Sequence, residues 1–113
     1  MILNKSIQKP LKVLTKGEIT KSALIELKLR GANCWMQNNL AVPGRKFIGR
    51  KGVSDIIGFV NATGLFLVCE VKTIDDVFSD DQKKFLTEVK QAGGIALYAT
   101  QELNNVVIKP WEG

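Results

Sequence analysis

Residues 52–72 read GVSDIIGFVNATGLFLVCEVK, two apolar runs separated by a short polar turn. The turn, Asn61–Gly64, has the residue types that reverse a chain between two strands. Both runs are apolar on both faces in their middles, as expected of central strands in a sheet that is covered on both sides. We therefore predict a β-hairpin whose strands are Asp55–Val60 and Leu65–Lys72.

The predicted hairpin brings three charged side chains together. If residues 61–64 form a four-residue loop, Val60 pairs with Leu65, and Asp55 then lies opposite Glu70. Directly opposed residues of two antiparallel strands have Cβ atoms roughly 4.5–5.5 Å apart on one face. Because residues two apart in a strand share a face, Lys72 projects on the same side as Glu70. We expect Asp55, Glu70 and Lys72 to converge at one end of the hairpin.

The acid-x-Lys pattern is weak evidence when taken alone. It occurs four times, starting at Glu26, Glu70, Asp81 and Glu88. The other three examples lie on predicted helices, where residues two apart point roughly 200° away from each other and cannot share a site. A cross-strand surface network of Asp, Lys and Glu is the structural alternative to a catalytic site.

Two opposed carboxylates repel each other, and a divalent cation relieves that repulsion. Mg²⁺ favours one or two carboxylates together with waters and phosphate oxygens. In this interpretation Asp55 and Glu70 bind one or two Mg²⁺ ions, and Lys72 orients the nucleophile or neutralises developing charge, giving phosphodiester hydrolysis. The 113 residues include no histidine, which excludes Ser–His and Cys–His triads and His-containing zinc sites.

The rest of the chain alternates helical and strand patterns. Capping boxes begin at Thr15 and Ser79, and glycines follow the two helices that they predict. The expected elements are a helix over 15–30, a strand over 33–37, a helix from 79 to about 92, and strands over 95–99 and 106–108. The expected buried positions are Ile19, Ala23, Leu24 and Leu27 on the first helix and Phe85, Leu86, Val89 and Ala92 on the second. This order predicts an α/β sandwich around a mixed sheet, as one domain over 1–113 with its core at about 15–109.

Charge is unevenly distributed along the chain. Residues 1–54 contain 11 Lys and Arg but 2 acids, whereas residues 55–113 contain 5 and 9. The glycine-rich segment Pro43–Gly52 includes Arg45, Lys46, Arg50 and Lys51, which we interpret as a cationic loop for nucleic-acid phosphates, DNA or RNA. A solvated surface loop is the alternative. No apolar run approaches the ~20 residues of a membrane span, and no secretory signal is visible, so we expect a cytoplasmic protein.

Several motifs in the same order resemble a known family. They are Gly52–Ile57 with Asp55, Glu70-Val-Lys72, Ser79–Gln82 followed by Phe85 and Leu86, and Gly93-Gly94 before a strand. Together, from about Glu18 to Thr100, they resemble the virus-type replication-repair nucleases (VRR-NUC), a branch of the PD-(D/E)XK nucleases. Ser54 stands where that family usually has proline before the motif aspartate.

The resemblance implies a restriction-endonuclease-like core, with a central mixed β-sheet flanked by helices. It also implies DNA cleavage that depends on Mg²⁺, with Mn²⁺ substituting, and no organic cofactor. Branched DNA is the implied substrate, and small stand-alone members are similar to Holliday-junction resolving enzymes that act as homodimers. The implied location is the cytoplasm of a bacterial or phage-infected host cell, with no membrane partner.

The resemblance also extends to further site residues. Glu18 matches the acid that begins the first helix and often completes the metal site, and Glu26 is its rival. Gln82 matches a glutamine that supports the site or contacts phosphate, and the backbone carbonyl of Val71 is a further implied metal ligand. Glu18 and Gln82 have a structural alternative, because each is also the fourth residue of a capping box.

Three other functions remain open from the sequence. The same active site could cut flaps, nicks or duplex DNA instead of junctions. The fold could also serve a non-catalytic nucleic-acid-binding module, or the chain could be a basic structural protein.

Overall fold

The computed structural model describes residues 9–37 and 49–113, and all of the predicted helices and strands are present in it. The elements are α1 (Lys16–Leu29), β1 (Ala32–Met36), β2 (Ile56–Val60), β3 (Phe66–Val71), α2 (Asp80–Gln91), β4 (Ile95–Glu102) and β5 (Asn105–Pro110). Thr15 and Ser79 are the N-caps of the two helices, and both capping boxes are formed as predicted. The last two strands are longer than expected. No helix in the described residues is long and apolar enough to cross a membrane.

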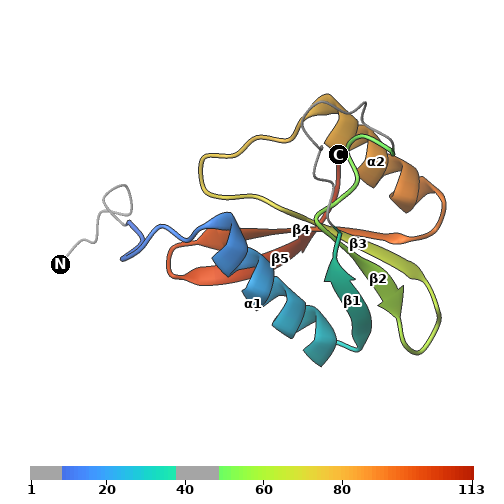
Figure 1. Cartoon of the computed structure of the whole chain (residues 1–113), viewed down its shortest axis with the longest axis horizontal. Helices are drawn as coiled ribbons and strands as arrows, with labels where there is room; N and C mark the ends of the chain where they lie inside the picture. Colours follow the sequence, from blue (N-terminus) through green and yellow to red (C-terminus); the bar gives the residue numbers. More distant parts are fainter. Residues whose placement is uncertain (1–8, 38–48) are drawn as a thin grey trace.

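The strands form one mixed sheet in the order β1-β2-β3-β4-β5. Strands β3 and β4 are parallel, and the other neighbouring pairs are antiparallel. Helix α2 provides the crossover between the two parallel strands, as a parallel pair requires. Figure 1 shows α1 on one face of the sheet and α2 on the other. The architecture is therefore the predicted α/β sandwich.

Each helix packs a separate cluster of buried residues against its own face of the sheet. The α1 cluster includes Ile19, Ala23, Leu27, Ile56, Leu67, Cys69, Val71 and Ala99. The α2 cluster includes Val68, Phe85, Leu86, Val89 and Ala96. Strand β3 contributes alternate residues to both clusters, and β4 contributes Ala99 to the α1 cluster and Ala96 to the α2 cluster, so these two strands are covered on both sides.

Two expectations about burial were wrong. Ala92 is exposed, because α2 ends at Gln91 and Ala92 is its C-cap, beyond the face that packs on the sheet. Strand β2 is not fully covered either. Phe59 is 38% exposed and lies opposite Phe66, which is 46% exposed, because α2 packs against β3 and β4 instead.

Candidate active site

The hairpin has the register that the sequence predicts. Ile56 pairs with Cys69 and Phe59 with Phe66, so Asp55, one residue before β2, lies opposite Glu70. The Val71 amide donates a hydrogen bond to Asp55 Oδ2 at 2.9 Å, which anchors this carboxylate to the end of β3. Glu70 and Lys72 alternate with residues of the α1 cluster, so both project towards the α2 side of the sheet.

Glu70 is a buried carboxyl group with an unusual environment. Only 1% of the residue is exposed. Its Oε1 accepts a hydrogen bond from Gln82 Nε2 at 3.2 Å, whereas no donor among the described residues reaches Oε2. Burial, together with the neighbouring Asp55 carboxyl, raises the pKa of Glu70 to about 9. Without a cation, the site therefore favours a protonated Glu70.

Asp55 behaves in the opposite way. Burial alone would raise its pKa, but hydrogen bonds with Glu70, with the Val71 amide and with Lys16 lower it below the ordinary value. The two carboxyls are close enough to share a proton, which places the negative charge on Asp55. Opposed shifts of neighbouring acids are typical of functional sites, although ion-pair networks also produce them.

Lys72 is held on the same side of the sheet by three contacts. Its Nζ donates to Gln82 Oε1 at 2.7 Å and to the Val77 carbonyl at 2.9 Å, and it lies 5.1 Å from the centre of the Phe78 ring. The residue is 8% exposed, so the ammonium is largely shielded from bulk water. These contacts fix its position beside Glu70.

Gln82 links the acid to the lysine. Its amide nitrogen donates to Glu70, and its amide oxygen accepts from Lys72 and also from the Ser79 backbone, at 2.9 Å. The same side chain therefore closes the α2 capping box and bridges two of the predicted catalytic residues. The capping role and the site role of Gln82 are therefore compatible in this geometry.

Lys16, which sequence reasoning missed, also lies at this site. It is the first residue of α1, and its Nζ forms an ion pair with Asp55 Oδ1 at 2.9 Å. Burial would lower the pKa of Lys16, but Asp55, with smaller effects from Glu70 and Asp76, raises it. One signal could have found it: the positive end of a helix disfavours a cation, so a lysine in the first turn suggests a nearby anion.

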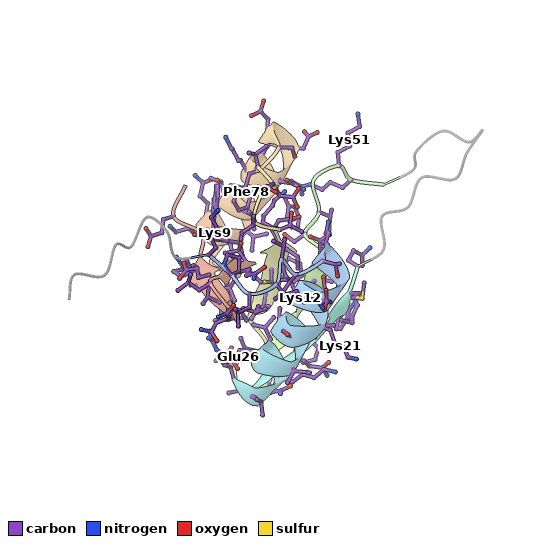
Figure 2. All side chains as sticks on the ribbon, turned by 90° about the vertical axis from the view of Figure 1, so that its left-hand side faces the viewer. Lys9, Lys12, Lys21, Glu26, Lys51 and Phe78 are labelled. Atoms are coloured by element: carbon purple, nitrogen blue, oxygen red, sulfur yellow. The ribbon has the colours of Figure 1, made fainter. Side chains whose placement is uncertain are left out.

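Glu18 and Glu26 are not brought to this carboxylate pair. The Glu18 carboxylate accepts hydrogen bonds from Lys12 Nζ at 2.7 Å and from the Thr15 amide at 3.1 Å, and these contacts lower the pKa of Glu18 to about 2. Glu26 pairs with Arg30 one helical turn further along α1. Figure 2 shows Glu26 at the end of the molecule opposite to Lys51, and well away from Phe78.

The predicted cationic loop is described in part. Arg45 and Lys46 lie outside the described residues. Arg50 forms an ion pair with Glu88 and lies 5.0 Å from the centre of the Phe85 ring, so its guanidinium is bound to α2. Lys51 is exposed, and Figure 2 shows its side chain directed away from the body of the molecule.

The loop borders a pocket over the carboxylates. This pocket has a volume of about 340 Å³ and is lined by Arg50, Lys51, Gly52, Val53, Asp55, Glu70, Ser79, Asp81 and Gln82. Gly52 has a φ of +81°, and a Cβ there would lie 2.3 Å from the Asp81 carbonyl oxygen, so a side chain would push the loop away from α2. The close contact keeps Asp55 and the start of α2 on opposite sides of one small pocket.

The donor set fits one kind of metal ion. No three His, Cys, Asp or Glu side chains in residues 9–37 and 49–113 lie close enough together to bind a metal. Asp55 and Glu70 are nevertheless a pair of hard oxygen ligands, and Glu70 Oε2 is buried with no donor among the described residues. Mg²⁺ is commonly bound through one or two carboxylates, with water and phosphate oxygens as its other ligands. The residues present therefore fit a Mg²⁺-type ion completed by water and substrate.

Comparisons with known proteins agree with this description of the fold. Hjc of Archaeoglobus fulgidus, a Holliday junction resolvase, has a similar structure, with a TM-score of 0.57 and 20% sequence identity over 83% of this chain and 75% of that chain. At this identity the likeness shows the fold alone, and it confirms the predicted restriction-endonuclease-like core. No curated protein sequence matches the chain. The family model of the VRR-NUC domain, which describes its sequence pattern, matches residues 45–101. This segment is half of the chain and includes Asp55, Glu70, Lys72 and Gln82. The chain therefore belongs to the VRR-NUC domain family.

Proposed function

We propose that this chain is a metal-dependent endonuclease that hydrolyses phosphodiester bonds in DNA. The main support is the buried Glu70 carboxyl, which faces Asp55, has an oxygen without a donor among the described residues, and is joined through Gln82 to Lys72. An ion-pair network that only stabilises the fold needs ionised acids, whereas burial of Glu70 opposes its ionisation. A cation and a phosphate would complete this arrangement.

Asp55 and Glu70 would hold the metal, with the Val71 backbone carbonyl as a further ligand, and Mg²⁺ is the ion that we propose, with Mn²⁺ as a substitute. When bound, such an ion polarises the scissile phosphate and lowers the pKa of a bound water. Glu18 is a weaker candidate ligand than the sequence suggests, because its carboxylate is occupied by Lys12 and Thr15.

The chain's own residues supply position and charge. Lys72 uses two of its N–H groups on Gln82 and Val77, which leaves a third for an oxygen of the phosphate or of the attacking water. Gln82 orients both Lys72 and Glu70, and its own orientation is fixed by the start of α2. Support of this kind around a metal ligand commonly contributes 10–100-fold to affinity or activity.

Lys51, Arg50, Arg45 and Lys46 are the residues that we propose to contact DNA. Lys51 is exposed at the rim of the pocket, and the Arg50 guanidinium has donors beyond those used on Glu88. Phosphate contacts of this kind give affinity and salt dependence without sequence preference.

For the substrate, we propose branched DNA, with Holliday-junction resolution by a homodimer as the specific activity. The support is the family, together with the fold shared with a protein described as a Holliday junction resolvase. A four-way junction needs paired cuts, which two copies of one chain can make. The cytoplasm is the location that we propose for this activity.

Cleavage of a labelled synthetic four-way junction tests the proposal. We expect cutting by the wild type with Mg²⁺ but not with EDTA, and no cutting by Asp55→Asn under conditions where it still binds the junction. Asp75→Asn, which changes an exposed acid in the loop between β3 and α2, is the matched control and should cut normally. Persistent cutting by Asp55→Asn would refute the assigned site.

The same assay decides the substrate and the assembly. Cutting of flaps, nicks or linear duplex in preference to the junction would correct the substrate and retain the chemistry. Junction binding without any metal-dependent cutting would instead indicate a non-catalytic module. Light scattering should report a dimer, and a monomer that still makes paired incisions would refute the homodimer.

A further inference from the structure

The ion pair between Lys16 and Asp55 joins α1 to the carboxylate pair from the opposite side of the sheet to α2. Lys16 Nζ lies 2.9 Å from Asp55 Oδ1, and it is the first residue of the helix. The peptide dipoles make this end of a helix positive, so a lysine there is unfavourable unless an anion compensates it. Asp55 is that anion.

The four carboxylate oxygens of the site are not equally available. Asp55 Oδ2 accepts from the Val71 amide, Asp55 Oδ1 is paired with Lys16, and Glu70 Oε1 accepts from Gln82. Glu70 Oε2 alone lacks a donor within the described part of the chain. A cation that bridges both acids also needs an oxygen of Asp55. Oδ1 is the one whose partner is a side chain that can move away, whereas Oδ2 is bonded to the backbone of β3.

We propose that Lys16 is the resident counter-cation of Asp55, and that a divalent ion must displace it in order to bind the carboxylate pair. This inference rests on the proposed function, because it takes Asp55 and Glu70 as the metal ligands. A divalent ion and an ammonium on the same oxygen repel each other strongly at such short distances. Metal binding at Asp55 Oδ1 and the ion pair between Lys16 and Asp55 therefore exclude each other.

The exchange needs no rearrangement of the fold. The Lys16 side chain is 51% exposed, so its ammonium can move into water while the helix stays in place. A half-exposed ion pair of this kind is weak, so a divalent ion can readily replace it. The lysine neutralises Asp55 in the metal-free protein and lowers the apparent affinity for the metal.

Calorimetric titration with Mn²⁺ tests the competition directly. We expect Lys16→Met to bind Mn²⁺ roughly two- to fivefold more tightly than the wild type, because the competing ammonium is gone. Lys16→Arg retains the charge and should bind like the wild type. Lys21→Met removes an exposed lysine from the same helix, and is the matched control with unchanged affinity.

Thermal unfolding gives a readout that a merely structural role would not produce. In EDTA, Lys16→Met should melt below Lys21→Met, because the Asp55 carboxylate loses its counter-cation. At saturating Mn²⁺ the difference should disappear, since the metal now supplies the charge. A structural lysine would instead lower the melting temperature equally in both conditions.

The outcomes separate this inference from the proposed function. If Asp55→Asn abolishes Mn²⁺ binding but Lys16→Met and Lys21→Met bind Mn²⁺ equally, the counter-cation role is overturned and the metal site stands. If Asp55→Asn binds Mn²⁺ as the wild type does, the proposed metal site fails and the role of Lys16 fails with it.

Discussion

The two helices begin with the same local structure, and yet only the start of α2 contacts both Glu70 and Lys72. At α1 the Glu18 amide donates to Thr15 Oγ1 at 3.2 Å, and at α2 the Gln82 amide donates to Ser79 Oγ at the same distance. In each box the side chain of the fourth residue accepts from the N-cap amide, at 3.1 and 2.9 Å. The local hydrogen bonds do not distinguish the two helix starts.

The difference lies in what each side chain does with its remaining atoms. The second oxygen of Glu18 accepts from the exposed Lys12, whereas Gln82 uses its nitrogen on Glu70 and shares its oxygen with Lys72. A carboxylate only accepts, but an amide both donates and accepts, so it can bridge an acid and an ammonium. A capping box becomes part of a site when long-range packing places it beside one and its residue type suits both sides.

After the loss of the proposed metal ligands themselves, the largest expected effect comes from removing Lys72, the lysine at one end of this bridge. Lys72→Met should lower the cleavage rate by about 10²–10⁴-fold, the range for a group that transfers a proton or stabilises developing charge. Lys84→Met, an exposed lysine on α2, is the control and should cut normally. Single-turnover cleavage of the junction measures both. A loss of less than twofold would leave Lys72 as a structural residue.

The bridge itself should matter less than the groups that it joins. Gln82→Ala should lower cleavage by roughly 10–100-fold, as expected for a residue that orients a metal ligand. Glu18→Ala removes the corresponding residue of α1 and should leave cleavage unchanged, because Glu18 does not contact the carboxylate pair. The same assay compares the two variants. Equal losses would mean that both helix starts support cleavage, and that Glu18 belongs to the active site as the family resemblance implies.

Burial of Glu70 should be visible in the pH dependence of stability. Because its folded-state pKa is raised from 4.5 to about 9, the contribution of Glu70 is fully present below pH 4.5 and is lost as the pH rises towards 9. Glu70→Gln should therefore be the more stable protein in EDTA at pH 8, by at least about 1 kcal/mol.

Urea unfolding between pH 5 and pH 9 measures this effect, with Glu112→Gln, at an exposed acid, as the control. The lowered pKa of Asp55 acts in a different window, because its contribution is lost only as the pH falls below its ordinary value of 3.8. A wild type whose stability matches Glu70→Gln across the whole range would contradict the environment that we describe for Glu70.

The smallest effects should come from the caps. Thr15→Ala and Ser79→Ala should each lower the free energy of unfolding by about 1 kcal/mol, since each removes a hydroxyl that accepts a helix amide. Thr15→Ala should not alter cleavage, whereas Ser79→Ala should lower it, though by less than Gln82→Ala does. Denaturant unfolding and the junction assay together measure both quantities. Identical activity in the two variants would mean that the α2 cap does not help to position Gln82.

Much of the fold could be predicted because its signals are local. The turn at Asn61–Gly64 sets the register of the hairpin, and the register places Asp55 opposite Glu70. The capping boxes fix the start of both helices. The exposure of Ala92 and of Phe59 could not be predicted, because it depends on where α2 comes to rest on the sheet.

The contacts of the site were less predictable for the same reason. The ion pair of Lys16 with Asp55 joins residues 39 positions apart through the packing of α1, and no periodic pattern in the sequence predicts it. The contacts of Arg50 with Glu88 and Phe85 of α2 likewise depend on where α2 packs, and nothing in the sequence indicates them. Gln82 was identified through its family resemblance and its cap, and its bridging geometry became visible only with α2 in place.

The most direct test is the anomalous scattering of Mn²⁺ in crystals of this protein. The account predicts one or two strong peaks between Asp55 and Glu70, within coordination distance of their carboxylate oxygens, with the Lys16 ammonium no longer bound to Asp55 Oδ1. A peak at another group of acids, or none while Lys16 remains paired with Asp55 at saturating Mn²⁺, would contradict it.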